Sequence, residues 1–503
     1  RRLFWVLRRP PVSPDMAYAA ITMLTAFSLR LVPELISPRY PVGYDTASYA
    51  YEVPHVMERA PHLIILGSLL FHVIAWALLQ ATSMDVYSLL KVLGPLTYGF
   101  LALSFYVFLR SALSWSEERS LLCSLLCSLQ VPTLRLSWDL FKSELGLAMF
   151  FLFAATVRSE LKHKWILAGV LAFLTVLSHQ LAAIMMFVWS AWELLASRDR
   201  EMAIRMALAL LPSAVLFSLQ LALYYKLLAL PAPSGPSRPG RTIIYLRPAV
   251  EARQPRFLRD YFLAYNFLGA SYYDLAATLL KLLAVCYLPL LPLAFAGARR
   301  DRAVDPLMIW PTVATFSVLV LPSAYPFYSF FRWLLLLVFP MAIYATSGLL
   351  RLKKTLGRYW RPVLVALMGM YLAVAVGYAS GAFSYVVDED VNAYMPRSLV
   401  ESTIGINQID DCITCLEWLS GRASNGSVLI AEQRFYPWAL QFLDARIAIA
   451  LYPHGYPIED VPAPGLADDF SEIYLIWYSG GQIDGFREAF SSGDVAIYEY
   501  EAH

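Results

Sequence analysis

Long apolar runs dominate the pattern of hydrophobic and polar positions along this chain. A helix that spans a membrane needs about 20 predominantly apolar residues. Windows of this kind lie at Met16–Ile36, Leu89–Leu109, Leu121–Leu136, Leu140–Val157, Trp165–Leu177, Ala182–Ala196, Ala203–Leu228, Ala276–Ala296, Pro306–Leu321, Trp333–Leu350 and Pro362–Tyr378. The pattern predicts a polytopic α-helical membrane protein.

One further apolar stretch, Leu63–Leu79, has polar or helix-breaking residues on both sides. Pro61 and His62 precede it, and Ser83 and Asp85 follow it. Such flanks suit a helix that lies along the membrane surface or dips into it. We therefore predict about eleven spans and one interfacial helix.

The positions of the charges predict the topology. Only 16% of the residues are charged, whereas soluble domains carry about 25%. Lys and Arg gather on the cytoplasmic side of membrane proteins. Clusters lie at residues 1–9, 158–164, 198–205, 299–302 and 351–361. Their alternation predicts an inside N-terminus and an outside tail, in the plasma membrane. No segment near the start resembles a removable signal peptide. The net charge of +2 says nothing about nucleic acid, and no nucleic-acid partner is expected.

Three segments are then predicted on the outer face: Ser37–Val86, Arg135–Lys142 and the long loop Pro231–Tyr273. The long loop carries six arginines, against the positive-inside pattern: Arg238, Arg241, Arg247, Arg253, Arg256 and Arg259. Long loops cross the membrane largely regardless of charge. Alternatively, an outward basic loop meets an anionic group such as a lipid phosphate.

Composition changes after residue 380, which predicts a membrane domain at 1–380 and a soluble outer domain at 381–503. The tail shows β-like runs at Ser427–Ala431, Glu472–Trp477 and Val495–Tyr500, with a short helix at Pro437–Leu443 between them. These alternating elements predict a small α+β domain.

The five cysteines are too few for a disulfide scaffold. Cys123 and Cys127 lie one turn apart in an apolar run and are expected to be core residues. Cys412 and Cys415 form a lone CxxC. A zinc site needs a second pair, so a local disulfide or two free thiols is expected.

Asp45 is the first candidate for chemistry, because it follows the first apolar window among aromatic residues such as Tyr44. An ordinary loop Asp in an Asx-turn is the alternative. An ionisable group at the membrane face is nevertheless a functional candidate, and partial burial would tune its basicity.

Two other short outer segments carry polar residues. Asp139 and Lys142 are three residues apart and share one face of a helix, although Asp139 could simply favour a helix N-terminus. His179 and Gln180 join two apolar windows on the same side. A lone His is more often a hydrogen-bonded structural residue than a catalyst.

Arg332 stands at the outer entrance of a late apolar window, close to Tyr325 and Tyr328. Its guanidinium could snorkel to lipid headgroups. A guanidinium is also a bidentate partner for phosphate, and the aromatic residues would suit an isoprenoid chain or a sugar face.

The arrangement of these residues resembles the GT-C superfamily of membrane glycosyltransferases, which includes dolichyl-phosphate-mannose protein mannosyltransferases and the aminoarabinose transferase that acts on lipid A. The resemblance rests on Gly43-Tyr-Asp45, then on Ala60-Pro-His-Leu-Ile-Ile-Leu66 before the second span, on Asp139 and on Arg332. Two features depart from the family pattern. Thr46, not an acid, follows Asp45, and no Trp-Trp-Asp-Tyr-Gly signature of oligosaccharyltransferases occurs.

The resemblance implies transfer of a sugar from a polyprenyl (dolichyl) phosphate to a glycan, lipid or protein acceptor at the outer face. Asp45 would be the general base, and Arg332 and Lys142 would bind the donor phosphate. Tyr44, Asp139, His179, Tyr325 and Tyr328 would contact substrate. No metal is required, although Asp139 leaves a divalent ion possible.

Two other classes remain open. A transporter or lipid flippase would commonly show repeated halves and charges in the middle of spans, and neither is evident here. A non-catalytic assembly factor whose tail binds a partner is the other alternative.

Overall fold

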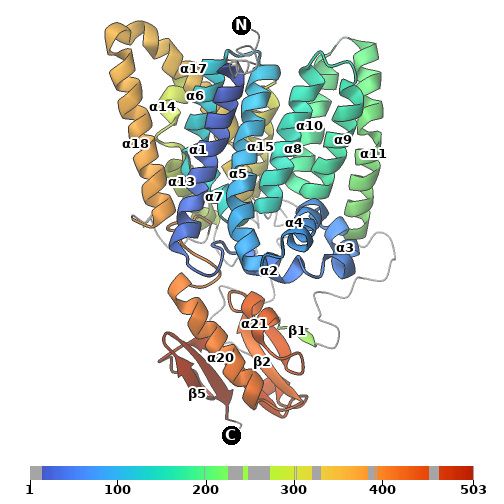
Figure 1. Cartoon of the computed structure of the whole chain (residues 1–503), viewed down its shortest axis with the longest axis vertical. Coiled ribbons are helices and arrows are strands. Elements are labelled where there is room, and N and C mark those ends of the chain that lie inside the picture. The colour runs from blue at the N-terminus through green and yellow to red at the C-terminus, as the bar shows by residue number, and fades with distance from the viewer. Residues whose placement is uncertain are drawn as a thin grey trace, which may run out of the picture.

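Helices account for most of the chain, and a small sheet lies at its C-terminal end (Figure 1). The computed structural model describes residues 14–197, 199–224, 242–246, 272–299, 301, 303–319, 330–382, 391, 394–452 and 464–501. The helices of the membrane part are α1 (Pro14–Ile36), α2 (Thr46–Glu52), α3 (Val56–Ile65), α4 (Leu69–Thr82), α5 (Val86–Ser111), α6 (Glu117–Ser128), α7 (Val131–Asp139), α8 (Phe141–Arg158), α9 (Lys164–Ser178), α10 (Gln180–Ala196), α11 (Arg200–Tyr224), α13 (Tyr272–Tyr287), α14 (Leu291–Gly297), α15 (Asp305–Phe316), α16 (Phe330–Leu336), α17 (Val338–Leu356) and α18 (Trp360–Ser380).

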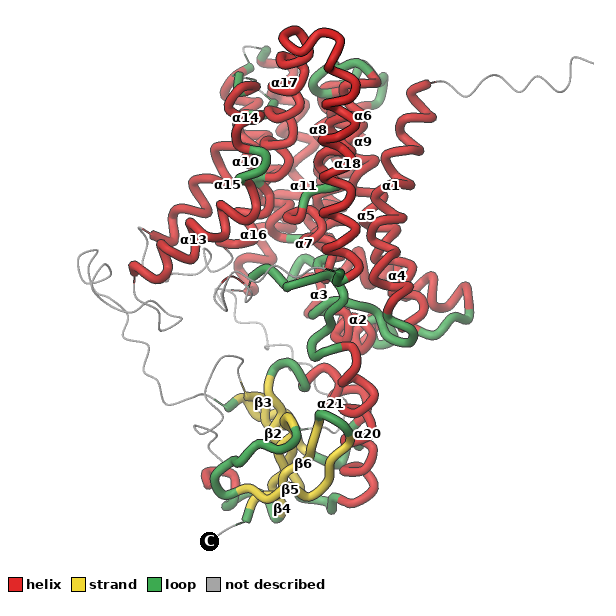
Figure 2. Tube along the Cα trace, turned by 90° about the vertical axis from the view of Figure 1, so that its left-hand side faces the viewer, coloured by secondary structure: helices red, strands yellow, loops and turns green. Residues whose placement is uncertain are grey.

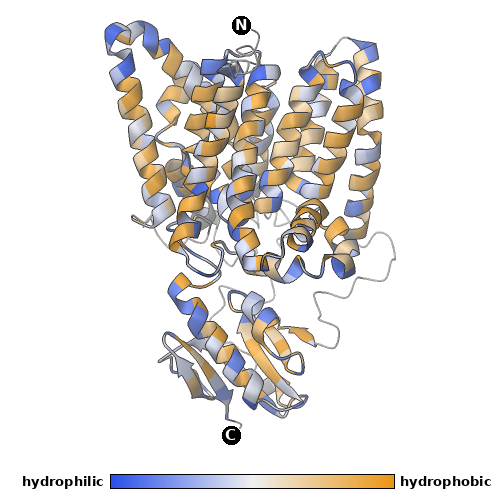
Figure 3. Cartoon of the chain, in the orientation of Figure 1, coloured by the Kyte–Doolittle hydropathy of each residue, from blue (hydrophilic) through white to orange (hydrophobic). Residues whose placement is uncertain are grey.

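Figure 3 shows apolar residues along the whole length of the bundle and hydrophilic residues in the turns farthest from the C-terminal domain. Within the described residues, four helical stretches are long and apolar enough to cross a membrane, and six are if each of two bent pairs counts as one span. Three shorter apolar helices, α4, α9 and α10, accompany them. The membrane class is therefore supported, and the number of eleven spans stays a prediction.

Two windows that were predicted as single spans are broken helices. Within Leu121–Leu136, α6 and α7 meet at 66°, because Pro132 in the first turn of α7 cannot donate a backbone hydrogen bond to the preceding turn. Within Ala276–Ala296, a bend of 76° separates α13 from α14, where Pro289 and Pro292 lie. The first break matters for function, since α7 ends at Asp139.

The predicted interfacial helix Leu63–Leu79 is also two helices. Gly67, with φ of +61°, separates α3 from α4, and a side chain there would approach the Val176 carbonyl oxygen to 3.1 Å. The two helices have 10 and 14 residues, so at 1.5 Å per residue neither reaches the ~30 Å of a bilayer core. Together with α2 they lie at the end of the bundle nearest the C-terminal domain (Figure 1).

The C-terminal domain contains a six-stranded sheet in the order β1-β3-β2-β4-β6-β5. Its elements are α20 (Ile409–Arg422), β2 (Ser427–Glu432), α21 (Tyr436–Phe442), β3 (Ala448–Tyr452), β4 (Glu472–Tyr478), β5 (Phe486–Ser492) and β6 (Val495–Tyr500). The predicted runs appear as β2, β4 and β6, and the predicted short helix as α21. Strands β1 to β4 pair in parallel, and β6 and β5 are antiparallel. The sheet and α20 lie below the helical bundle (Figure 2).

One strand of this sheet comes from outside the tail. β1 (Ile243–Tyr245) belongs to the long loop and pairs with β3. The sequence pattern did not predict it, because three residues are too few for a period to appear. All five cysteines are free and buried, so Cys412 and Cys415 in α20 form no disulfide.

The C-terminal domain packs directly on α2. Tyr40, Ala47 and Tyr51 belong to the same apolar cluster as the buried residues of α20 and α21. The Gln441 amide in α21 donates to the Ala47 carbonyl oxygen at 2.7 Å, and the Trp438 ring meets Tyr40 edge-on at 5.3 Å. The C-terminal domain therefore helps to fix the helix that begins after Asp45.

Candidate functional site

Gly43 brings the loop between α1 and α2 against the end of α7. Its φ of +120° is strained for any other residue. A Cβ there would lie only 2.2 Å from the Trp138 carbonyl oxygen. The Gly43 amide donates to the Glu401 carbonyl oxygen at 2.7 Å, so the loop lies between α7 and the start of the tail.

A buried ion pair in α1 braces the same loop. Arg30 and Glu34 are one turn apart, 2.7 Å from each other and almost fully buried. Arg30 Nε donates to the Ser137 carbonyl oxygen at 2.8 Å, and the Val42 amide donates to Glu34 at 3.3 Å. This pair was not among the residues predicted from the sequence. Two opposite charges at i and i+4 inside an apolar window were the available signal.

Asp45 occupies the N-cap position of α2, but its side chain makes no capping hydrogen bond. Thr46 serves the turn instead, since its hydroxyl donates to the Gly43 carbonyl oxygen at 2.6 Å. Among the described residues, the Asp45 carboxylate has no hydrogen bond or ion pair. The Asx-turn alternative is therefore not what the structure contains.

The surroundings of Asp45 make its carboxyl group a stronger base than usual. Burial, and then the negative charge of Asp139, raise the pKa of Asp45 to about 6. The positive charges of Lys142, Arg332 and, more weakly, Arg135 oppose part of this rise. Asp139, Lys142 and Arg332, which are all far from Asp45 in sequence, therefore act electrostatically on Asp45.

Asp139 has a direct partner. Arg135 Nη1 donates to Asp139 Oδ1 at 2.7 Å, one turn away on α7, and both side chains are buried. Arg135 Nε also donates to the Tyr394 carbonyl oxygen at 2.8 Å. This pairing gives Asp139 a structural role at the site. Arg135 is a site residue that sequence reasoning missed.

Lys142 lies in the first turn of α8 over the ring of Tyr49, with Nζ 5.5 Å from the ring centre. The Tyr49 hydroxyl donates to the Asp139 carbonyl oxygen at 2.9 Å. Tyr49, one turn after Asp45, was not among the predicted site residues, because nothing in the sequence distinguishes it from other aromatic residues. It connects α2 to both neighbouring helices.

Lys142 also faces a second carboxylate. Burial raises the pKa of Glu52, but a hydrogen bond with His72 at 2.8 Å and the electrostatic effects of His72, Lys142 and Arg59 outweigh it and lower the pKa to about 2. Arg59 forms an ion pair with Glu52 at 3.2 Å. Glu52 is thus held ionised beside the site.

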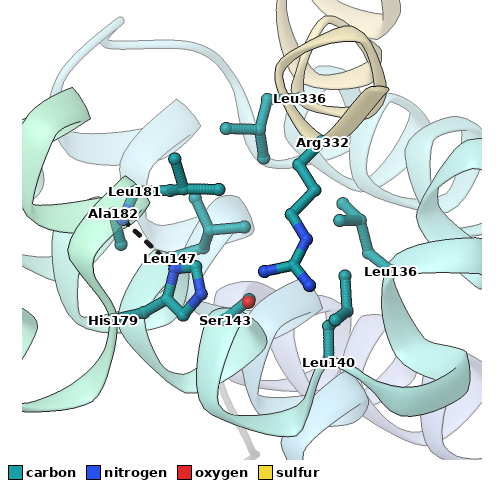
Figure 4. A pocket seen from close by; sticks show the side chains of 9 residues that line it. All are labelled: Leu136, Leu140, Ser143, Leu147, His179, Leu181, Ala182, Arg332 and Leu336. Atoms are coloured by element: carbon teal, nitrogen blue, oxygen red, sulfur yellow. Dashed lines mark hydrogen bonds between the residues drawn. The ribbon is translucent and has the colours of Figure 1, made fainter. Parts of the chain in front are cut away.

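Arg332 and His179 line one small pocket, together with Ser143 and six apolar residues of α7, α8, α10 and α16 (Figure 4). The guanidinium of Arg332 points into the space between Leu136, Leu140 and Ser143 (Figure 4). Within the described residues Arg332 has no ion pair, and its buried Nε has no hydrogen-bond partner. A half-buried guanidinium without a direct ion pair favours an anionic ligand.

His179 is a hydrogen-bonded structural residue, which is the alternative that its sequence position offered. Its Nδ1 accepts from the Leu181 amide at 3.3 Å and caps α10. The same ring lines the pocket beside Arg332, so the structural role and contact with a ligand are compatible.

Tyr44 faces the C-terminal domain as well as the site. Burial and the charge of Asp45 raise its pKa, and Glu432 and Arg434 of the C-terminal domain also interact with it electrostatically. Tyr325, Tyr328 and the six arginines of the long loop lie outside the described residues.

In the part of the chain that the structure describes, no group of three or more His, Cys, Asp and Glu side chains is placed to hold a metal ion. The site combines two carboxylates with the cations Arg135, Lys142 and Arg332 near the ends of helices. One carboxylate is available to accept a proton, and Arg332 is available to an anion. This combination suits the attack of a hydroxyl group and the departure of a phosphate.

Comparisons with known proteins agree at the level of fold. No protein-family model and no curated protein matches the chain. Among solved structures, a mutant of the mycobacterial arabinofuranosyltransferase AftD matches over 97% of this chain and 42% of its own length, at 12% identity and a TM-score of 0.54. A second class of that mutant gives a TM-score of 0.52 at 12% identity, over 96% of this chain and 41% of its own length. ArnT from Cupriavidus metallidurans, solved with undecaprenyl phosphate, gives 0.49 at 11% identity, over 96% of this chain and 97% of its own length.

The chain thus spans about two fifths of the length of the AftD structures that it matches. At such low identity the likeness shows a shared fold and no more. The chain has the fold of GT-C membrane glycosyltransferases, as the resemblance predicted.

Proposed function

We propose that this chain is an inverting glycosyltransferase that moves a sugar from a polyprenyl-phosphate donor to an acceptor at the outer face of the plasma membrane. The observation that carries the proposal is the Asp45 carboxyl group. It has no direct partner among the described residues, its pKa is raised to about 6, and Arg332 and Lys142 act on it electrostatically.

Asp45 accepts the proton of the acceptor hydroxyl as the acceptor oxygen attacks the anomeric carbon of the sugar. The new glycosidic bond forms on the face opposite the breaking bond between the anomeric carbon and the phosphate oxygen. A base with a pKa near the working pH suits this step, because it is both largely ionised and able to hold the proton.

Arg332 and Lys142 neutralise the charge that develops on the leaving lipid phosphate. The leucines around Arg332 (Leu136, Leu140 and Leu336) give an isoprenoid chain an apolar environment beside the phosphate. Tyr44, Asp139 and His179 border the same region, and Tyr44 lies toward the C-terminal domain, from which a water-borne acceptor can approach. A glycan, lipid or protein acceptor is compatible with this geometry.

The test is a donor-binding and transfer assay with the purified chain in proteoliposomes. We expect Arg332→Gln to weaken binding of a polyprenyl phosphate by about 1.5–3 kcal/mol, since the ligand phosphate loses a charge-assisted hydrogen-bond donor. Arg351→Gln, at the opposite end of the bundle, is the matched control and should bind normally. Unchanged binding by Arg332→Gln contradicts the assignment. Movement of the lipid between leaflets without a new glycosidic bond would instead identify a flippase.

A further inference from the structure

A second amphipathic cavity lies at the end of the bundle away from the C-terminal domain. It is a crevice of about 580 Å³ between α6, α17 and α18. Leu122 and Leu125 of α6, Leu350 of α17, and Leu364 and Met368 of α18 form apolar walls. The turn that joins α17 to α18 is hydrophilic (Figure 3), and Lys353 and Trp360 at its two ends line the crevice.

Two cations line this crevice. Arg119 belongs to the first turn of α6 and Lys353 to the last turn of α17. Arg119 Nη2 donates to the Ser347 hydroxyl at 2.8 Å, and its guanidinium stacks 3.5 Å above the Trp115 ring. Its Nε has no hydrogen-bond partner in the described part of the chain. The guanidinium is therefore held in place with a donor still unsatisfied.

The charge at the mouth is positive overall. One carboxylate, the exposed Glu118, also lines the crevice, and Asp301 acts electrostatically on Arg119. Exposed Arg351 and Lys354 flank Lys353, and Arg358 and Arg361 follow in the same turn. An anion that reaches Arg119 and Lys353 is thus surrounded mainly by cations.

A groove of the same size elsewhere on the bundle provides an internal comparison. The groove between α9 and α11 also measures about 580 Å³ and is apolar. Its one charged lining residue, Arg205, already forms an ion pair with Glu201. Both grooves therefore have a similar apolar volume. The crevice differs from the groove between α9 and α11 because its cations, Arg119 and Lys353, have no carboxylate partner in the described structure.

We propose that the crevice between α6, α17 and α18 binds one anionic glycerophospholipid, with its phosphate at Arg119 and Lys353 and an acyl chain along the leucines. Charge-assisted hydrogen bonds from a guanidinium and an ammonium group suit a phosphodiester. Basic pockets between membrane helices recognise lipid headgroups by this chemistry. The site lies at the opposite end of the bundle from Arg332 and does not depend on the proposed glycosyl transfer.

Native mass spectrometry of the full purified chain tests this proposal. Delipidated protein is titrated with phosphatidylglycerol and with phosphatidylcholine of equal chain length. We expect one phosphatidylglycerol to bind about tenfold or more tightly than phosphatidylcholine, because both lipids offer a phosphate to the two cations but only phosphatidylcholine also brings a choline cation, which the surrounding positive charges repel. The double variant Arg119→Gln/Lys353→Gln should lose this preference, and the control Arg205→Gln should keep it.

Three outcomes would overturn the proposal: equal binding of the two lipids, an unchanged double variant, or an equal loss in Arg205→Gln. Stronger binding of a polyprenyl monophosphate than of phosphatidylglycerol would overturn the lipid class. If the double variant elutes as aggregate, Lys353→Gln alone decides, because Lys353 is exposed and its replacement removes only one charge from the mouth.

Discussion

Asp45 and Asp139 belong to the same group of charges but are held in opposite ways. Asp139 ends a fully buried helix and is fixed by Arg135 at 2.7 Å. Asp45 begins a short helix, and its carboxylate has no direct partner among the described residues. The difference teaches that the number of carboxylates in a site does not give the number of bases. A carboxylate in a buried ion pair supports the structure, and an unpaired one can exchange a proton.

The largest expected effect is a loss of stability when the buried ion pair between Arg135 and Asp139 is broken. Asp139→Asn leaves the Arg135 charge without its counter-charge, which typically costs about 3–5 kcal/mol in a buried pair. We expect a marked fall in the thermal midpoint in detergent. Arg135→Met/Asp139→Leu, which removes both charges, should recover much of it. An Asp139→Asn protein as stable as wild type would show that the pair is not structural.

Asp45→Asn should reverse this result, with activity lost and stability kept. The amide keeps the shape of the side chain and removes its basicity, so sugar transfer should fall by roughly 10²-fold or more. Donor binding and the thermal midpoint should stay close to wild type, since no direct bond is broken. Turnover and melting are measured on the same purified sample. A stable, fully active variant would remove the main support for the enzyme hypothesis.

The smallest expected effect is a shift in the pH dependence of transfer, which tests how the neighbouring charges set the pKa of Asp45. With the pKa of Asp45 raised to about 6, transfer should decline as pH falls through about 6, because the base becomes protonated. Lys142 lowers this pKa by its positive charge. Lys142→Gln should therefore raise it and move the acid limb of the rate profile to higher pH. Lys354→Gln, an exposed lysine at the far end, should leave the limb in place.

An acid limb that stays unchanged in Lys142→Gln would separate Lys142 from the Asp45 environment. A limb that moves to lower pH would contradict the sign of the interaction. Rates are compared at saturating donor, so that weaker phosphate binding is not mistaken for a change in protonation.

The sequence predicted the fold class and several residues at the site because their signals are local. Asp45, Asp139, Lys142, His179 and Arg332 are polar residues at the ends of apolar windows. The break between α6 and α7 also had a local signal in Pro132, but the apolar run Leu121–Leu136 around it predicted one continuous span.

Long-range contacts could not be predicted in this way. Gly43 meets Trp138 and Glu401, and Arg135 meets Tyr394, contacts that join residues about 95 to 360 positions apart. No pattern along the chain encodes such distances. The roles of Asp45, Lys142 and Arg332 in catalysis remain predictions.

The pairing of β1 with β3 has a consequence for how the chain is threaded through the membrane. Ile243 lies opposite Ile449 in one sheet, so the long loop and the tail must be on the same side of the bilayer. The chain between them therefore crosses an even number of times, whatever the distribution of Lys and Arg. The four apolar windows between Ala276 and Tyr378 satisfy this requirement. On the predicted topology, β1 can join β3 only after the last of these windows has entered the membrane, so a complete sheet would indicate that insertion has finished.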